Sequence, residues 1–198
     1  MGSQEVARGA GRGGQREGRL WIAAAAWVAL IYSTLYFVRV PIEFLRERNL
    51  LRLTVAAAFL LAAATVLFLL LRRKPGWRSV VVLGVFAVAY LGVFLSMERA
   101  EEKLHFIEYG VLGGVVYAAF LERRARCEAR PVSARWGRWW PAPAAVVLTS
   151  LLGWGDEGIQ AVLPNRVYEL RDVGLNVAAA LLAVTAMSVW RWTERCKH

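Results

Sequence analysis

Cysteine and histidine are scarce in this chain, which has two cysteines and two histidines in 198 residues. Cys127 and Cys196 both lie in basic segments that we expect in the cytoplasm, where thiols stay reduced. No spacing of Cys with His resembles a zinc site. The sequence also lacks a serine nucleophile elbow, a phosphate-binding glycine loop and a dinucleotide fingerprint. It therefore identifies no cofactor and no reaction class by motif.

Charged residues are few beside apolar ones. They make up 20% of the chain, hydrophobic residues make up 58%, and the mean hydropathy is +0.41. Several apolar runs approach the roughly 20 residues that a helix needs to cross a bilayer, whereas the strands of soluble α/β proteins are shorter. We predict an all-α polytopic membrane protein of about six transmembrane helices, with a short irregular turn between the fifth and the sixth. The predicted spans are 20–38, 53–71, 79–97, 104–121, 142–163 and 173–190.

The two ends of the chain are predicted to lie outside this membrane domain, which covers residues 20–192. Residues 1–19 contain six glycines and four arginines without apolar periodicity, a composition typical of a disordered tail. Residues 193–198 form a short basic tail. Between the first two spans, residues 39–52 mix apolar and charged side chains and are predicted to lie along the membrane surface.

The basic residues predict the topology. The net charge is +10, yet no nucleic-acid-binding module is present, so nucleic acid is not an expected partner. Lys and Arg instead follow the ends of apolar runs. With six spans, seventeen of the 25 fall on the side of the two termini. Because cytoplasmic loops carry excess positive charge, we predict an inner-membrane protein with both termini in the cytoplasm and membrane lipids as partners.

Two polar clusters, 98–109 and 153–176, interrupt the apolar sequence on the predicted outer side. An ionisable group at membrane depth costs roughly 2.5 to 3.5 kcal/mol unless it is paired or hydrated. Residues three or four apart share a helix face, which places polar side chains on one face of three helices. These faces must converge on one another or on a hydrated cavity. Their members are His105, Glu108 and Tyr109, then Asp156 and Gln160, then Asp172 and Asn176.

Three interpretations of this convergence stay open. The cluster could only join helices by polar contacts. It could bind or transport a ligand, with Arg presenting a planar fork to a phosphate or glycan headgroup. It could also perform acid–base catalysis; His with carboxylates could hold a divalent ion, but no strong ligand spacing is present and we predict no metal. The candidate catalytic residues are His105, Glu108, Asp156, Glu157 and Asp172. The candidate substrate-binding residues are Glu101, Lys103, Tyr109, Gln160, Arg166, Arg171 and Asn176.

The turn between the last two spans carries a further expectation. Pro164 ends the fifth helix, and Asn165 suits a turn. Arg166 then lies where the chain reverses, and we predict that its guanidinium pairs with Asp172 at the start of the sixth helix.

The two clusters together resemble the VanZ-like membrane protein family. The first motif is His105-Phe106-x-Glu108-Tyr109-Gly110-x-Leu112-Gly113. The second is Asp156-Glu157-x-x-Gln160-x-x-x-Pro164-x-Arg166, followed by Arg171-Asp172 and Asn176. The resemblance covers roughly residues 98–184. Many members have Asp-Lys where this chain has Glu101-Glu102.

The resemblance implies a small multi-helix bacterial membrane protein, related to one that gives low-level resistance to teicoplanin, a lipoglycopeptide. It implies no reaction, so it carries over only the motif positions. The broader expectation is a function in the cell envelope on a lipid-linked or glycosylated substrate.

Overall fold

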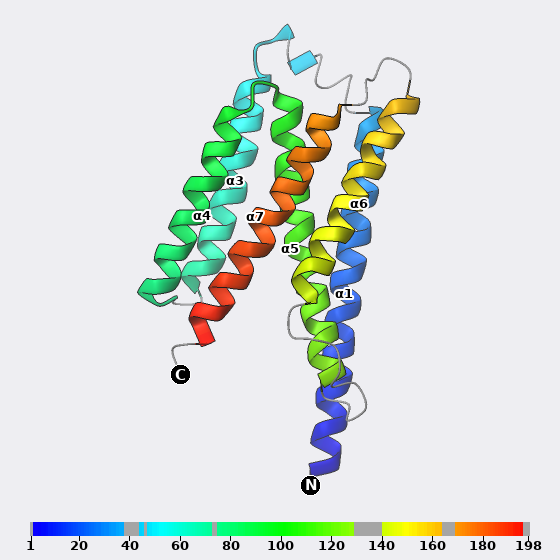
Figure 1. The fold of residues 1–198 in the computed structure, drawn as a ribbon, viewed down its shortest axis with the longest axis vertical. Helices are drawn as coiled ribbons and strands as arrows, with labels where there is room; N and C mark the ends of the chain where they lie inside the picture. The colour runs from blue at the N-terminus through cyan, green and yellow to red at the C-terminus, as the bar shows by residue number, and fades with distance from the viewer. Residues whose placement is uncertain are drawn as a thin grey trace.

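The computed structural model describes residues 2–37, 44–45, 47–72, 75–128, 140–163 and 169–195. In this part of the chain all regular structure is helical and no strand is present, which confirms the predicted all-α class (Figure 1). The helices are α1 (Gly2–Phe37), α3 (Leu51–Arg72), α4 (Trp77–Ser96), α5 (Ala100–Glu128), α6 (Pro141–Val162) and α7 (Leu170–Arg195).

Prolines mark several helix boundaries. Pro75 and Gly76 directly precede α4, and Pro141 occupies the first turn of α6, where its fixed φ suits a helix and its missing N–H costs nothing. At the other end of α6, the backbone N–H of Leu163 donates to the carbonyls of Ile159 and Gln160. As a result, α3, α4 and α6 each begin and end within two residues of the predicted spans.

Three helical segments are long and apolar enough to cross a membrane: Trp77–Ser96, Glu102–Cys127 and Leu170–Arg195. The stretch Leu53–Thr65 of α3 is apolar as well, and α3 as a whole is 22 residues long. Large apolar side chains are exposed on α3, α4 and α6, including Leu61, Val88 and Leu151. Extensive exposed apolar surface of this kind marks a lipid- or partner-facing surface. Among the described residues these three helices are candidates to cross a membrane, which supports a membrane protein, and the six predicted spans stay a prediction.

Helix α5 lies at the centre of the bundle and packs against α1, α3, α6 and α7 (Figure 1). Its side chains Phe106, Tyr109 and Leu112 are fully buried. A Cβ atom on Gly113 would lie 3.2 Å from the Cα of Ala180. The glycine therefore lets the backbones of α5 and α7 approach closely, which is the packing role expected of small residues between membrane helices.

The first nineteen residues differ from the predicted disordered tail, because α1 begins at Gly2. Glu17 is buried and forms an ion pair with Arg126 of α5. The Trp21 ring meets Phe120 of α5 edge-on, at a centroid distance of 5.1 Å. These contacts with α5 supply tertiary stabilisation that a local composition argument cannot include.

The C-terminal end also differs from its prediction. Residues 193–195 belong to α7 and are not a separate tail. Thr193 Oγ1 lies 2.9 Å from Ser79 Oγ of α4, and Glu194 accepts a hydrogen bond from the same serine. Residues 39–43 and 46 of the predicted surface segment 39–52 lie outside the described residues, and residues 51 and 52 belong to α3.

The polar clusters gather at one end of the bundle. The start of α5, the end of α6 and the start of α7 lie together there, opposite the first residues of α1 and the last of α7 (Figure 1). This up-and-down arrangement is what brings sequence segments fifty residues apart to one site.

Candidate functional site

The site is built on the buried face of α5. Glu102, His105 and Tyr109 follow one another at helical spacing on this face, with exposed fractions of 1%, 8% and 0%. Asp156, Glu157 and Gln160 of α6 and Asn176 of α7 are buried as well. The predicted convergence of three polar helix faces is therefore what the structure contains, at the interface of α5, α6 and α7.

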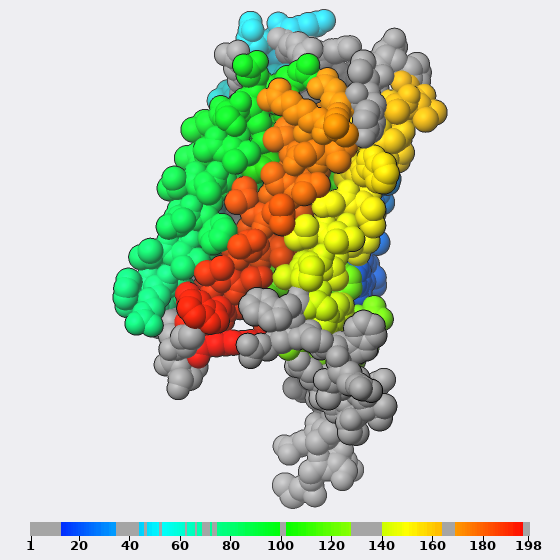
Figure 2. Space-filling model, viewed as in Figure 1, coloured from blue at the N-terminus to red at the C-terminus, as the bar shows by residue number. Residues whose placement is uncertain are grey.

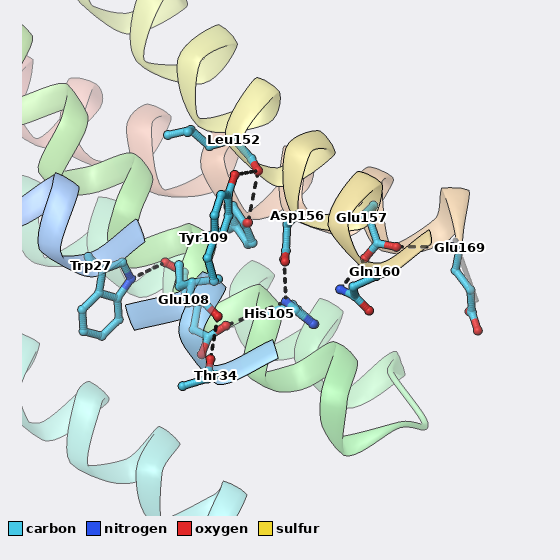
Figure 3. Close-up of polar contacts among 12 residues, drawn as sticks. Trp27, Thr34, His105, Glu108, Tyr109, Leu152, Asp156, Glu157, Gln160 and Glu169 are labelled. Carbon is cyan, nitrogen blue, oxygen red and sulfur yellow. Dashed lines mark hydrogen bonds and ion pairs between the residues drawn. The ribbon is translucent and has the colours of Figure 1, made fainter. Parts of the chain in front are cut away.

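His105 and Asp156 form the centre of the site. Nδ1 of His105 lies 3.3 Å from Oδ2 of Asp156 and 3.8 Å from Oε2 of Glu108 (Figure 3). Asp156 is completely buried. A carboxylate this close to Nδ1 favours a proton on Nδ1, which leaves Nε2 of the neutral imidazole as the acceptor. The pair thus has the arrangement of a general base oriented by a carboxylate.

Hydrogen bonds from aromatic side chains of α1 and α5 fix the backbone next to the His105–Asp156 pair. The hydroxyls of Tyr32 and Tyr109 donate to the backbone carbonyl of Leu152, at 2.8 Å and 3.4 Å. The Trp27 indole N–H donates to the backbone carbonyl of Glu108, at 3.1 Å (Figure 3). Leu152 lies one helical turn before Asp156, so these bonds fix the α6 turn that carries the carboxylate.

Close packing positions Asn176. A Cβ atom on Gly153 would lie 2.9 Å from Cβ of Asn176 and 3.3 Å from Cε1 of Tyr109. Only a glycine fits at this crossing of α6 with α5 and α7. The Asn176 side chain is fully buried, and neither atom of its amide has a hydrogen-bond partner among the described residues. Leaving such a group unsatisfied costs about 1 to 3 kcal/mol, so this amide offers bonding capacity to a polar ligand.

Glu157 links the end of α6 to the start of α7. Its Oε1 accepts a hydrogen bond from Gln160 Nε2 at 3.2 Å, and its Oε2 accepts one from the backbone N–H of Glu169 at 3.3 Å (Figure 3). The Glu157 carboxylate is therefore used in closing the connection between the two helices. This position favours a structural role for Glu157 over the catalytic role that the sequence suggests.

A second group of charged side chains lies around the starts of α5 and α7. Carboxylate oxygens of Glu102, Glu169 and Asp172 lie within 4.8 Å of one another. Arg171 Nη1 lies 3.4 Å from Oε1 of Glu102, and Arg99 pairs with Glu169. The hydrogen bond from Arg99 to Glu169 raises the pKa of the guanidinium, which stays charged.

Not every predicted site residue joins this arrangement. Lys103 Nζ lies over the Phe94 ring of α4, 5.3 Å from its centroid, which is a cation–π contact away from the cluster. Arg166 lies outside the described residues, so its pairing with Asp172 stays a prediction. The side chain of Glu101 also lies outside them.

Several contributors were not singled out by the sequence. Arg99, Glu102 and Glu169 fall inside or beside the two polar clusters, and the polar density of those segments was the signal that could have identified them. Trp27 and Tyr32 lie in an apolar stretch of α1, where single aromatic residues are common and give no comparable signal.

Comparisons of the chain with protein-family models, with curated proteins and with solved structures find no match.

Proposed function

We propose that the chain is a VanZ-like protein of the inner membrane, and that its α5–α7 site acts on the polar head of a lipid-linked or glycosylated envelope substrate. The observation that carries this proposal is the His105–Asp156 pair, 3.3 Å apart and buried in the same bundle interior as the amide of Asn176. The phenotype that follows from the resemblance is altered susceptibility to teicoplanin.

Acid–base chemistry suits this site better than a purely structural role. A structural cluster gains stability by satisfying its own hydrogen bonds. Here Asn176 and Glu102 have buried polar atoms with no hydrogen-bond partner among the described residues. With Asp156 at Nδ1, Nε2 of His105 is the position from which a substrate proton can be taken or returned.

The surface beside the site supports a substrate with a hydrocarbon chain. A groove of about 340 Å³ lies between α6 and α7, which run side by side on the face shown in Figure 2. Val147, Leu151 and Trp154 of α6 line it, as do Val173 and Val177 of α7. Val173 directly follows Asp172, so the groove leads from the level of the polar cluster along the apolar surface. An acyl or isoprenoid chain in this groove places its headgroup at the charged end.

The variant Asn176→Leu tests lipid binding without an expected loss of stability. Because an unsatisfied buried amide is replaced by an apolar group of similar size, the melting temperature should stay constant or rise. We expect the purified wild-type protein to retain a lipid with a phosphate or glycan headgroup in native mass spectrometry. The Asn176→Leu variant should lose it. The same bulk phospholipids on both proteins would contradict the proposal.

A binding or transport protein without chemistry is the second candidate, favoured by the same groove. The two are distinguished by incubating the retained lipid with the protein in nanodiscs. A changed lipid mass indicates catalysis, whereas an unchanged mass with retained binding indicates transport or binding.

The topology is proposed with six spans and both termini in the cytoplasm. Both helix ends, at the start of α1 and the end of α7, lie at the end opposite the polar cluster. After Cys127 and Cys196 are replaced by serine, a cysteine at the exposed position Glu98 should react with an impermeant reagent in intact cells. A cysteine at the exposed position Arg78 should react only after lysis. The reverse pattern would overturn this orientation.

A further inference from the structure

Three carboxylates from two elements meet at the charged end of the bundle. Glu102 lies in the first turn of α5, Glu169 directly precedes α7, and Asp172 lies in the first turn of α7. One oxygen of each lies within 4.8 Å of the other two. Calcium, magnesium and manganese prefer oxygen ligands at about 2.0 to 2.6 Å, so oxygens on opposite sides of one ion are up to about 5 Å apart. The spread of the three oxygens matches a single shared ion.

Glu102 gives an independent sign that this cluster takes a ligand. Its side chain is 1% exposed, and neither of its oxygens has a hydrogen-bond partner among the described residues. Asp172 Oδ1 is also buried and also has no hydrogen-bond partner among the described residues. A carboxylate buried without hydrogen bonds is costly unless an opposite charge compensates it, and such groups are usually paired or coordinate metals.

The two neighbouring arginines compensate the negative charge of these acids only weakly, because both arginine side chains are largely exposed. Arg171 lies 3.4 Å from Oε1 of Glu102, and Arg99 pairs with Glu169, but both arginine side chains are 56% exposed. Exposed ion pairs contribute little stability, because water screens them and the long side chains lose entropy. Among the described residues, these three acids face two exposed arginines, which leaves a formal excess of one negative charge. A cation can displace either arginine without leaving that arginine buried.

We propose that Glu102, Glu169 and Asp172 bind one hard divalent cation such as Mg²⁺, Ca²⁺ or Mn²⁺. The ion would join the start of α5 to the start of α7. Glu102 lies three residues before His105 on the same helix face, so the ion would also lie one helical turn from the His105–Asp156 pair. This inference concerns cation binding and does not depend on the proposed substrate.

Manganese binding tests the site. The full-length protein in a neutral detergent is treated with EDTA, dialysed and titrated with MnCl2, and free Mn²⁺ is followed by electron paramagnetic resonance. We expect one bound ion per chain, and Ca²⁺ or Mg²⁺ should compete for it. Because charge and ligand count set the affinity of such sites, Glu102→Gln should weaken binding by about tenfold or more.

Two further variants complete the test. Glu98→Gln removes an exposed acid close in sequence and should leave the affinity unchanged. Glu169→Gln changes a side chain that is 31% exposed, so it tests the site even if Glu102→Gln does not fold. Weakening in Glu169→Gln together with an unchanged Glu98→Gln supports the site. Absence of wild-type binding at millimolar Mn²⁺, or equal affinity in wild type and Glu169→Gln, overturns it.

Discussion

Replacing Asp156 by asparagine should reduce the activity of the protein by about 100-fold or more, because it removes the carboxylate that orients His105, and a positioned general base contributes at least that much to a proton transfer. The substitution keeps the size of the side chain and removes the charge that faces Nδ1 of His105 at 3.3 Å. The measurement is conversion, in nanodiscs, of the lipid that native mass spectrometry identifies on the wild-type protein.

Melting temperature decides what a loss of activity means. Asp156→Asn should keep most of the wild-type stability in detergent, and Glu98→Gln, an exposed acid at the same end, should keep both activity and stability. If Asp156→Asn loses stability and activity together, the pair serves mainly to hold helices together. A fully active Asp156→Asn variant would remove Asp156 from the proposed chemistry.

Replacing Gly153 by leucine should cost about 3 kcal/mol of stability, at the upper end of the range for overpacking a core. Even a Cβ atom at this position would lie 2.9 Å from Cβ of Asn176, and Tyr109 closes the other side. The larger side chain must therefore push α6 away from α5 and α7. The free energy of unfolding, measured by denaturant titration in mixed micelles, reports the change.

Gly158 provides a matched control on the same helix. A Cβ atom there would meet nothing within 4 Å, and the residue is exposed. Leucine has a higher helix propensity than glycine by several tenths of a kcal/mol, so Gly158→Leu should be neutral or slightly stabilising. Equal losses in both variants would show that the crossing at Gly153 is not the reason for its glycine.

The all-α class and several helix limits follow from the sequence because their causes are local. Long apolar runs predict helices in a membrane, and prolines such as Pro75 and Pro141 mark where helices can start. The meeting of His105 with Asp156 also follows, since polar residues at helical spacing in apolar segments must face one another. In the part of the chain that the structure describes, three helical segments have the length and hydropathy to cross, and the six expected spans stay a prediction.

The features of the fold and of the site that the sequence does not predict depend on tertiary contacts. The bond from Tyr32 to Leu152 joins residues 120 apart, and no local pattern indicates that pair. The Glu17–Arg126 ion pair joins α1 to α5, and composition alone predicts disorder in the first nineteen residues because it cannot include such a contact. Lys103 and Arg99 are both basic residues near the cluster, yet only Arg99 reaches it, because Lys103 is directed to Phe94 on α4.

The orientation of the His105 ring is the measurement that tests the central claim most directly. His198 is the only other histidine, so a His198→Gln protein labelled with ¹⁵N-histidine gives the signals of one ring. If Asp156 holds Nδ1, the neutral imidazole should carry its proton on Nδ1, and Asp156→Asn should abolish that preference. A neutral ring that carries its proton on Nε2 in both proteins would contradict the account.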